Sequence, residues 1–241
     1  MEIEIELSDL LVKNFSKYAN HIVYERAIPL LNDGLKPVQR RVLLSMNNLG
    51  LNNNKPHRKS AKIIGDTVGQ YHPHSLDGPY GALVNMTATF SARYPLSDGS
   101  GNFGSIENDP PAAFRYTEAR LSKTGDLLLG DTNEATVPWM PTYDNEGLEP
   151  KYLGGFFPNI LCNYTNGIAA GVSSMIPYHN ATEVITALIK TIDQVNKGKD
   201  INTKFLMKYI KGPDFPTQGI IMNPDDIESV YENGKGKFVI R

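Results

Sequence analysis

A change in sequence texture near residue 91 does most to limit the fold of this 241-residue chain. Up to that point, apolar side chains recur every three or four positions, which is the spacing of helices with one buried face. Beyond it, glycine, proline and polar residues cluster in short runs that interrupt helices and separate strands. A chain in which a helical part precedes a strand-rich part, without regular alternation of the two, predicts the α+β class.

Four helices are predicted in the first part of the chain. They extend over residues 7–31, from Lys36 to near Gly50, from Ser60 to Gly69, and from Asp77 to Phe90. Pro37 suits the first turn of the second helix, because the N–H that proline lacks would be unpaired there in any case. A helix-turn-helix with cations in its first half is typical of a recognition helix in a DNA major groove, but paired short helices are also common in ordinary cores.

The second part predicts turns, strands and further helices. Gly99, Gly101 and Gly104 match a dinucleotide-binding pattern in letters, but that pattern must follow a buried strand and open a helix. Polar residues precede it here, so we expect the tip of a hairpin, or wing. The remaining expected elements are a helix over 116–130, an extended connection over 137–158, a strand pair over 159–172, helices over 181–195 and 203–210, and a strand over 219–222.

The composition is that of an ordinary globular protein, with 40% hydrophobic and 21% charged residues, and the length suits one large domain or two modest ones. No apolar run approaches the roughly 20 residues of a membrane-spanning helix, and the acidic start lacks the basic region of a signal peptide. We therefore expect a cytoplasmic protein with no membrane partner. The single cysteine, Cys162, cannot form an internal disulfide, and its apolar neighbours predict a buried, inert thiol.

Positive charge is concentrated in one segment, although the chain as a whole carries 24 basic and 26 acidic residues. No Asp or Glu occurs between residues 36 and 62, where the cations are Lys36, Arg40, Arg41, Lys55, Arg58, Lys59 and Lys62. A local basic surface is how proteins bind the phosphates of nucleic acids. The same pattern suits a solvated helix face, and charge alone does not decide between the two.

The neighbours Arg115 and Tyr116 place a phenol beside a guanidinium. A tyrosine hydroxyl has a reference pKa of roughly 10, so it needs a nearby cation, base or metal before it can act as a nucleophile. Arg115 is such a cation, which makes Tyr116 a candidate nucleophile toward a phosphate. On residue chemistry alone, a surface charge beside a half-buried aromatic ring is the commoner explanation.

Six segments, in this order, carry a resemblance to a known family: DGLKPVQRRVLLSM, KSAKIIGDTVGQYHPH, YPLSDGSGNFGS, AAFRYTEARLSK, NGIAAGVSSMIPYHN and GPDFPTQGII. They resemble the A-type subunits of bacterial type IIA topoisomerases, that is, of DNA gyrase or topoisomerase IV. The resemblance implies an N-terminal helical arm over residues 1–30. It further implies a winged-helix DNA-cleavage domain over 31–150 and the start of an α/β tower domain over 151–241. Gln39 stands where the family usually has histidine.

The resemblance implies that the chain cleaves and religates DNA as part of an ATP-dependent type II topoisomerase, an isomerase that controls supercoiling or decatenation. Tyr116 would form a 5′-phosphotyrosyl link, Arg115 would stabilise the charge, and His72 and Arg26 complete the catalytic set. We expect His72 to act as general base or acid, because its reference pKa of about 6.5 suits proton exchange. The residues expected to hold DNA are Lys36, Arg40, Arg41, Lys59, Lys62, His74 and Ile168.

Ile168 matches an apolar wedge that the family inserts between base pairs to bend the duplex. Without the resemblance, we would place Ile168 in the core. The flanking Gly167 is expected to let the backbone approach the minor groove.

The partners implied by the resemblance are double-stranded DNA, a second copy of this chain in a homodimer, and a B-type subunit in an A2B2 assembly. Mg²⁺ is expected on the TOPRIM fold of that B-type subunit, with ATP on its ATPase, so no metal ligand is assigned in this chain. Two alternatives remain: a winged-helix DNA-binding protein without chemistry, and a purely structural assembly subunit. The sequence does not separate gyrase from topoisomerase IV, or a fragment from a naturally split subunit such as some phage enzymes have.

Overall fold

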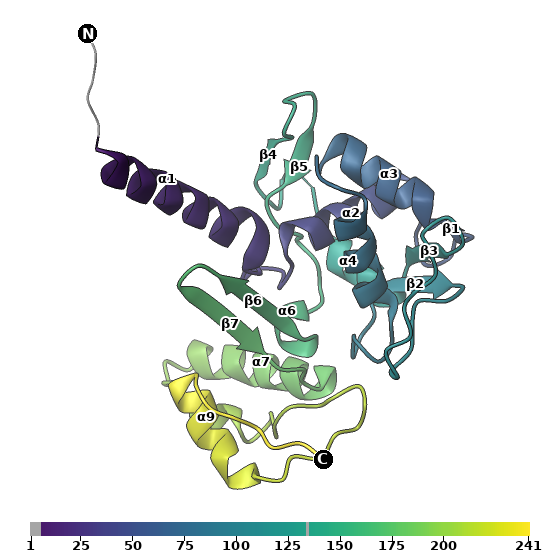
Figure 1. Ribbon diagram of the computed structural model, residues 1–241. Helices are drawn as coiled ribbons and strands as arrows, with labels where there is room; N and C mark the ends of the chain where they lie inside the picture. The colour runs from purple at the N-terminus through teal and green to yellow at the C-terminus, as the bar shows by residue number, and fades with distance from the viewer. Residues whose placement is uncertain (1–5, 134) are drawn as a thin grey trace.

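The structure, a computed structural model, describes residues 6–133 and 135–241. It begins with an arm in which α1 (Leu7–Ile22) continues into the π-helix η1 (Val23–Ala27), and this arm projects away from the rest of the molecule (Figure 1). No residue of α1 is buried, and Phe15 and Tyr18 on its apolar stripe are 63% and 62% exposed. The first predicted helix is therefore confirmed as far as Ala27, but its apolar side chains face solvent in the described chain.

The core forms where α2 (Pro37–Asn48) packs against α3 (Ser60–Gln70) and α4 (Asp77–Thr87). Its fully buried side chains include Leu43 and Met46 from α2, Ile63 and Ile64 from α3, and Leu83 from α4. These are positions that helical spacing predicts, so three of the expected helices are confirmed. One of these three helices, α4, ends at Thr87 and not at the predicted Phe90, because the backbone of Ala88 is extended.

The start of α2 shows how local chemistry shapes this region. Pro37 occupies the first turn, and the backbone N–H of Lys36 donates to Gln39 Oε1 at 2.9 Å. The first N–H groups of a helix lack intrahelical partners, so this contact stabilises the helix start. Gln39 therefore has a structural role at a position where the family usually has histidine.

A small antiparallel sheet packs beside these helices. Its strands are β1 (Arg58–Lys59), β2 (Ser97–Ser100) and β3 (Glu118–Leu121), in the order β1-β3-β2. The prediction of a helix over 116–130 is wrong for its first half, because residues 118–121 pair with both neighbouring strands and bury Ala119 and Leu121. The helix in this region, α5, covers only Lys123–Leu129 and is capped by Ser122, whose hydroxyl accepts from the Gly125 N–H at 3.0 Å.

The rest of the chain contains two hairpins and a helical layer. The first hairpin pairs β4 (Trp139–Pro141) with β5 (Leu148–Pro150), so the predicted extended connection is in part a hairpin. After α6 (Asn159–Cys162), the second hairpin pairs β6 (Thr165–Ala169) with β7 (Val172–Ile176) and lies between the arm and α7 (Ala181–Asn196) in Figure 1. The last elements are α8 (Thr203–Leu206), the 3-10 helix η2 (Pro224–Asp226) and α9 (Ile227–Asn233).

Two sequence expectations in this half are corrected. The predicted strand pair over 159–172 begins with a helical turn, and its strands lie later, because only residues from Thr165 onward find a cross-strand partner. The predicted strand over 219–222 is reduced to an isolated bridge between Ile221 and Ile240. The mixture of helices and antiparallel strands is nevertheless the predicted α+β class. No helix in the part of the chain that the structure describes is long and apolar enough to cross a membrane.

Candidate functional site

Tyr116 lies on the long connection between β2 and β3, with its side chain directed into solvent. It is 65% exposed, and the guanidinium carbon of Arg115 lies 4.7 Å from the centre of its ring. A cation at this distance interacts favourably with the ring face and places positive charge close to the phenol. The aromatic residue is thus not half-buried beside a surface charge, which was the commoner expectation from residue chemistry alone.

The turn that carries Tyr116 is fixed to the start of α3 and to α4. Thr117 is fully buried, and its Oγ1 donates to Ser60 Oγ at 2.8 Å while its carbonyl accepts from the Ser60 N–H at 2.9 Å. The Phe114 carbonyl accepts from the Ala61 N–H at 3.2 Å, and its ring packs edge-on against Tyr80. Because Phe114 and Thr117 hold the chain on either side of the Arg115–Tyr116 pair, the exposed phenol stands on a rigid base.

A second group of expected site residues gathers at the other end of α3. Arg41 Nη1 lies 3.1 Å from His72 Nδ1, and the His74 ring packs edge-on against His72 with 4.6 Å between centres. Burial, followed by the charges of Arg41, His74 and Arg26, lowers the pKa of His72 to about 4. General acid–base catalysis works best with a pKa near the working pH. The lowered pKa therefore weakens the expected role of His72 in proton exchange.

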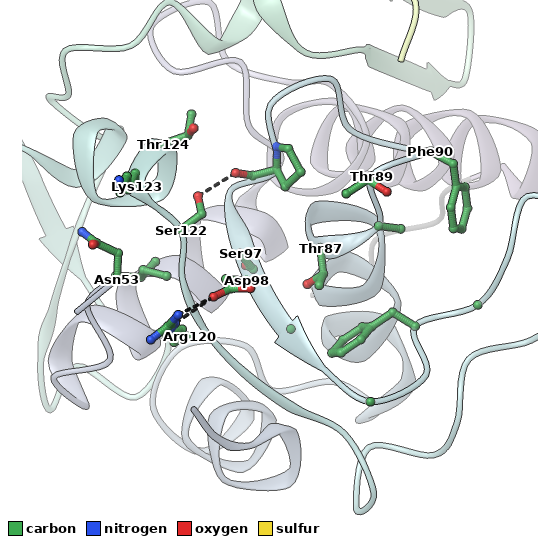
Figure 2. A pocket seen from close by; sticks show the side chains of 17 residues that line it. Asn53, Thr87, Thr89, Phe90, Ser97, Asp98, Arg120, Ser122, Lys123 and Thr124 are labelled. Carbon is green, nitrogen blue, oxygen red and sulfur yellow. Dashed lines mark hydrogen bonds and ion pairs between the residues drawn. The ribbon is translucent and has the colours of Figure 1, made fainter. Parts of the chain in front are cut away.

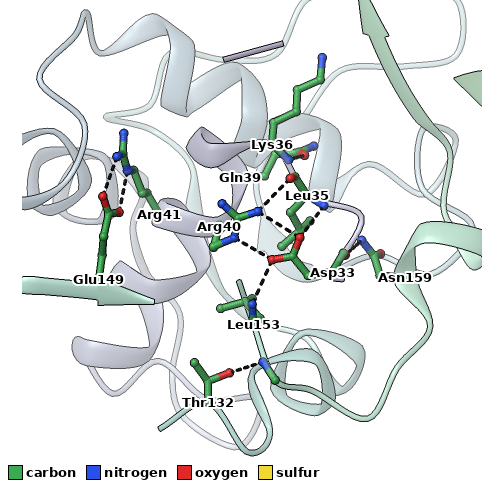
Figure 3. Close-up of polar contacts among 11 residues, drawn as sticks. Asp33, Leu35, Lys36, Gln39, Arg40, Arg41, Thr132, Glu149, Leu153 and Asn159 are labelled. Carbon is green, nitrogen blue, oxygen red and sulfur yellow. Dashed lines mark hydrogen bonds and ion pairs between the residues drawn. The ribbon is translucent and has the colours of Figure 1, made fainter. Parts of the chain in front are cut away.

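The two adjacent arginines of α2 are engaged inside the protein rather than free on its surface (Figure 3). Arg40 pairs with Asp33 through Nε–Oδ2 at 2.7 Å and Nη2–Oδ1 at 3.0 Å, and its Nη2 also donates to the Leu35 carbonyl at 3.0 Å. With 6% of its side chain exposed, Arg40 directs its donors toward Asp33 and Leu35. Arg41 makes two contacts to Glu149, at 2.6 and 2.7 Å, with 13% of its side chain exposed.

The remaining expected cations differ in how much charge they present. Lys62 on α3 and Arg26 at the end of η1 are exposed. Lys59 is exposed too, but its Nζ lies 2.9 Å from Glu118 across the β1–β3 pair, which neutralises part of its charge. Lys36 is partly buried, and burial lowers its pKa.

The expected site residues thus form two separate groups within one chain. The Tyr116 turn is bonded to the first residues of α3, whereas His72 follows the last residues, and its N–H donates to the Thr67 carbonyl at 2.9 Å. The 11 residues of α3 separate the groups by roughly 16 Å, at about 1.5 Å per helical residue. One copy of the chain does not bring the phenol and the His72 imidazole together.

Ile168 lies on β6 near the tip of the second hairpin and is 77% exposed, so the core position that residue type alone suggested is wrong. Met175 on β7 is 72% exposed and shares its face, because cross-strand pairs Ile168–Ser173 and Asn166–Met175 point to the same side. Sequence reasoning missed Met175, although the period of two along the strand would have placed it there. Gly167 faces inward, and a Cβ on it would lie 2.7 Å from the Ala27 carbonyl oxygen. Its close approach is therefore to η1.

A cavity of about 650 Å³ lies beside β2 and is distinct from both groups (Figure 2). Its walls include Thr87, Phe90, Phe103 and Lys123, and the Asp98–Arg120 ion pair (2.8 Å) lines one side. Within residues 6–133 and 135–241, no three His, Cys, Asp or Glu side chains are grouped so as to hold a metal ion. The candidate site consists of the exposed phenol, its guanidinium and the cations around α3.

Comparison with known proteins identifies relatives over nearly the whole chain. Residues 26–241 match the family of DNA gyrase and topoisomerase IV A-type subunits. The chain is 49% identical over 238 residues to the A-type subunit of DNA topoisomerase 4 from Staphylococcus epidermidis, a match that covers 99% of this chain and 29% of that protein. It is 46% identical over 239 residues to the A-type subunit of DNA gyrase from Kosmotoga olearia, again covering 99% of this chain and 29% of the relative. The chain thus spans about 29% of the length of these relatives.

Proposed function

Because this chain belongs to the family of DNA gyrase and topoisomerase IV A-type subunits, as its six segments predicted, we propose that it carries the DNA-cleaving tyrosine of a type II topoisomerase. The observation that carries the proposal is the placement of Tyr116. Its phenol is exposed on a hydrogen-bonded turn that buried Thr117 anchors, with the Arg115 guanidinium against its ring. Such an arrangement lets a duplex reach the nucleophile while the protein holds it still, which positioning catalysis requires.

In the proposed reaction, the Tyr116 oxygen attacks a DNA phosphorus. The new bond is a 5′-phosphotyrosyl ester, and the bond from phosphorus to the 3′ oxygen breaks. The phenol loses its proton, and the leaving 3′ oxygen gains one to become a hydroxyl. The reverse reaction reseals the strand without fuel, because one phosphate ester replaces another. Phosphoryl transfer depends mainly on positioning and on neutralising charge. Arg115 supplies positive charge against the ring that carries the attacking oxygen.

The remaining residues receive roles according to their exposure. Arg26, Lys62, Lys59 and His74 are exposed and would contact flanking phosphates, with partly buried Lys36 beside them. Arg40 would hold the turn before α2 through Asp33 instead of binding DNA. Ile168, with Met175 on the same face of the hairpin, would be the wedge that opens a base step.

A homodimer accounts for the separation of the two groups. The turn with Tyr116 is bonded to the start of α3, and His72 is bonded to its end. A two-fold arrangement can therefore place Tyr116 of one copy beside the cations of the other. Double-stranded DNA would lie across both copies. In the same proposal, a B-type subunit in an A2B2 assembly would hold Mg²⁺ and ATP. When bound, the metal supplies further charge neutralisation at the phosphate.

The domain assignment follows the same reasoning. The helices α2, α3 and α4 with the β1-β3-β2 sheet suit a winged-helix cleavage domain over residues 31–150, with the β2–β3 connection as the wing. Residues 1–30 would be the helical arm, of which residues 1–5 lie outside the described chain. Residues 151–241 would begin a tower domain, and the assembly would act on DNA in the cytoplasm.

The proposal is tested by trapping the covalent intermediate. The chain is incubated with a B-type subunit, Mg²⁺ and end-labelled duplex DNA, and the reaction is stopped with detergent. We expect a DNA–protein adduct whose attachment maps to Tyr116 and which Tyr116→Phe abolishes. Tyr24→Phe is the matched control, because Tyr24 is 73% exposed and also close to an arginine in sequence. Salt-dependent DNA binding without an adduct would instead support a non-catalytic DNA-binding protein.

A further inference from the structure

Glu149 is a buried carboxylate that the reaction proposed above does not use. It lies on β5, is 3% exposed, and is 108 residues distant in sequence from its partner Arg41. Both carboxylate oxygens are engaged, Oε2 by Arg41 Nε at 2.7 Å and Oε1 by Arg41 Nη2 at 2.6 Å (Figure 3). A two-point contact of this kind fixes the plane of a guanidinium, because the fork of donors matches the carboxylate.

The third nitrogen of the same guanidinium faces His72. Arg41 Nη1 lies 3.1 Å from His72 Nδ1. A guanidinium has only donors, so Nδ1 must accept and cannot carry a proton. The ring is then neutral with its proton on Nε2, which leaves an N–H directed away from Arg41. Such a ring donates a hydrogen bond but has no free lone pair with which to act as a base.

We propose that Glu149 is a positioning residue for DNA cleavage, whose carboxylate holds the Arg41 guanidinium against His72 Nδ1 so that the imidazole stays neutral and presents Nε2–H to a phosphate oxygen. The inference rests on the proposed function for the identity of the phosphate. The tautomer of His72 does not depend on that function. His72 becomes a hydrogen-bond donor, in place of the general acid or base that residue type suggests.

The groups around His72 agree with this arrangement. Arg41 from α2, Arg26 from η1 and the neighbouring His74 all face it with positive or titratable groups, and each lowers its pKa, as does burial. Glu149 adds a carboxylate to this contact chain and is held on the far side of Arg41. If its charge is removed, Arg41 is left buried without a counter-ion, and its side chain gains by turning toward solvent. His72 Nδ1 then loses its donor, and the pKa of His72 rises toward 6.5.

The first test is made on the unmodified chain. It contains five histidines, so ring-¹⁵N-labelled protein gives few enough signals for assignment, with His72→Gln identifying that of residue 72. We expect long-range ¹H–¹⁵N spectra to show a neutral ring with the proton on Nε2 from pH 7 down to pH 5. A proton on Nδ1, or a ring that protonates near pH 6.5, overturns the proposal whatever the cleavage assay shows.

The second test compares three variants of the β4–β5 hairpin. Glu149→Gln removes the charge with little change of shape, Glu149→Asp keeps the charge, and Glu146→Gln is the matched control because Glu146 is exposed on the same hairpin. In Glu149→Gln we expect His72 to titrate nearer 6.5 and cleavage of labelled DNA to fall about 10- to 100-fold, as for orienting partners in other sites. Glu149→Asp should restore part of both, and Glu146→Gln should change neither.

The outcomes separate this inference from the proposed function. If Tyr116→Phe abolishes the adduct but Glu149→Gln leaves the pH profile of cleavage and the His72 titration unchanged, Glu149 has no positioning role and the cleavage function stands. If Tyr116→Phe retains the adduct, the cleavage function fails while the His72 spectra still decide the tautomer. Should Glu149→Gln unfold, shown by loss of its circular dichroism melt, the spectra of the unmodified chain remain decisive.

Discussion

Replacing Arg40 by methionine separates a structural arginine from a DNA-binding one. Arg40 and Asp33 form an ion pair in which the carboxylate is completely buried. Asp33 also accepts from the backbone N–H groups of Leu35 and Leu153, each at 3.0 Å, so it joins three segments of the chain. Methionine fills a similar volume but offers no donor, and the Asp33 carboxylate would keep only its two backbone contacts.

The expected loss follows from the burial of this pair. Removing one partner of a buried ion pair typically costs about 3–5 kcal/mol, because the other charge stays buried and uncompensated. The two backbone N–H groups compensate Asp33 in part, so we expect roughly 3 kcal/mol for Arg40→Met. Adding Asp33→Asn removes the uncompensated charge, and the double variant should recover about 2 kcal/mol relative to additive effects.

Urea unfolding at pH 7, followed by circular dichroism, measures these differences. Lys62→Met is the matched control, because Lys62 is exposed on α3; it should unfold within about 0.5 kcal/mol of the parent and reduce the salt dependence of DNA binding. A phosphate-binding Arg40 would behave like Lys62. If Arg40→Met leaves the free energy of unfolding unchanged and lowers the salt slope, the structural assignment of Arg40 is refuted.

Three further outcomes are expected. Gly167→Ala should lower the free energy of unfolding by about 1–3 kcal/mol in urea, because its Cβ would lie 2.7 Å from the Ala27 carbonyl, whereas Gly65→Ala on α3, with open space among the described atoms, should not destabilise. Ile168→Ala should leave stability within about 0.5 kcal/mol but reduce DNA bending measured by fluorescence energy transfer between duplex ends; equal bending would exclude the wedge. Because the pKa of His72 is about 4 in the fold and 6.5 when unfolded, the unfolded chain binds more protons between these values. Stability should therefore fall as pH drops from 6.5 to 4, by less than about 2 kcal/mol from this residue after solvent screening, and His72→Gln should flatten that dependence in urea titrations.

Several features of this protein could be predicted from local sequence. The helices α2, α3 and α4 lie where apolar residues recur at helical spacing, since that period alone decides which face of a helix is buried. The six segments predicted the family that residues 26–241 match. The neighbours Arg115 and Tyr116 marked the candidate nucleophile, because adjacency in sequence guarantees proximity in space.

The tertiary structure alone decided which charged residues are paired inside the protein and which apolar residues are exposed. Arg40 and Arg41 are equivalent cations in the sequence, but their counter-ions Asp33 and Glu149 come from the turn before α2 and from a hairpin 108 residues beyond Arg41. Residues 118–121 continue a helical pattern, yet two strands distant in sequence pair with them. Likewise, pairing of β6 with β7 sets which face of the hairpin is exposed, and Ile168 lies on that face. Charge compensation and strand pairing join residues far apart along the chain, and a local pattern carries no record of such partners.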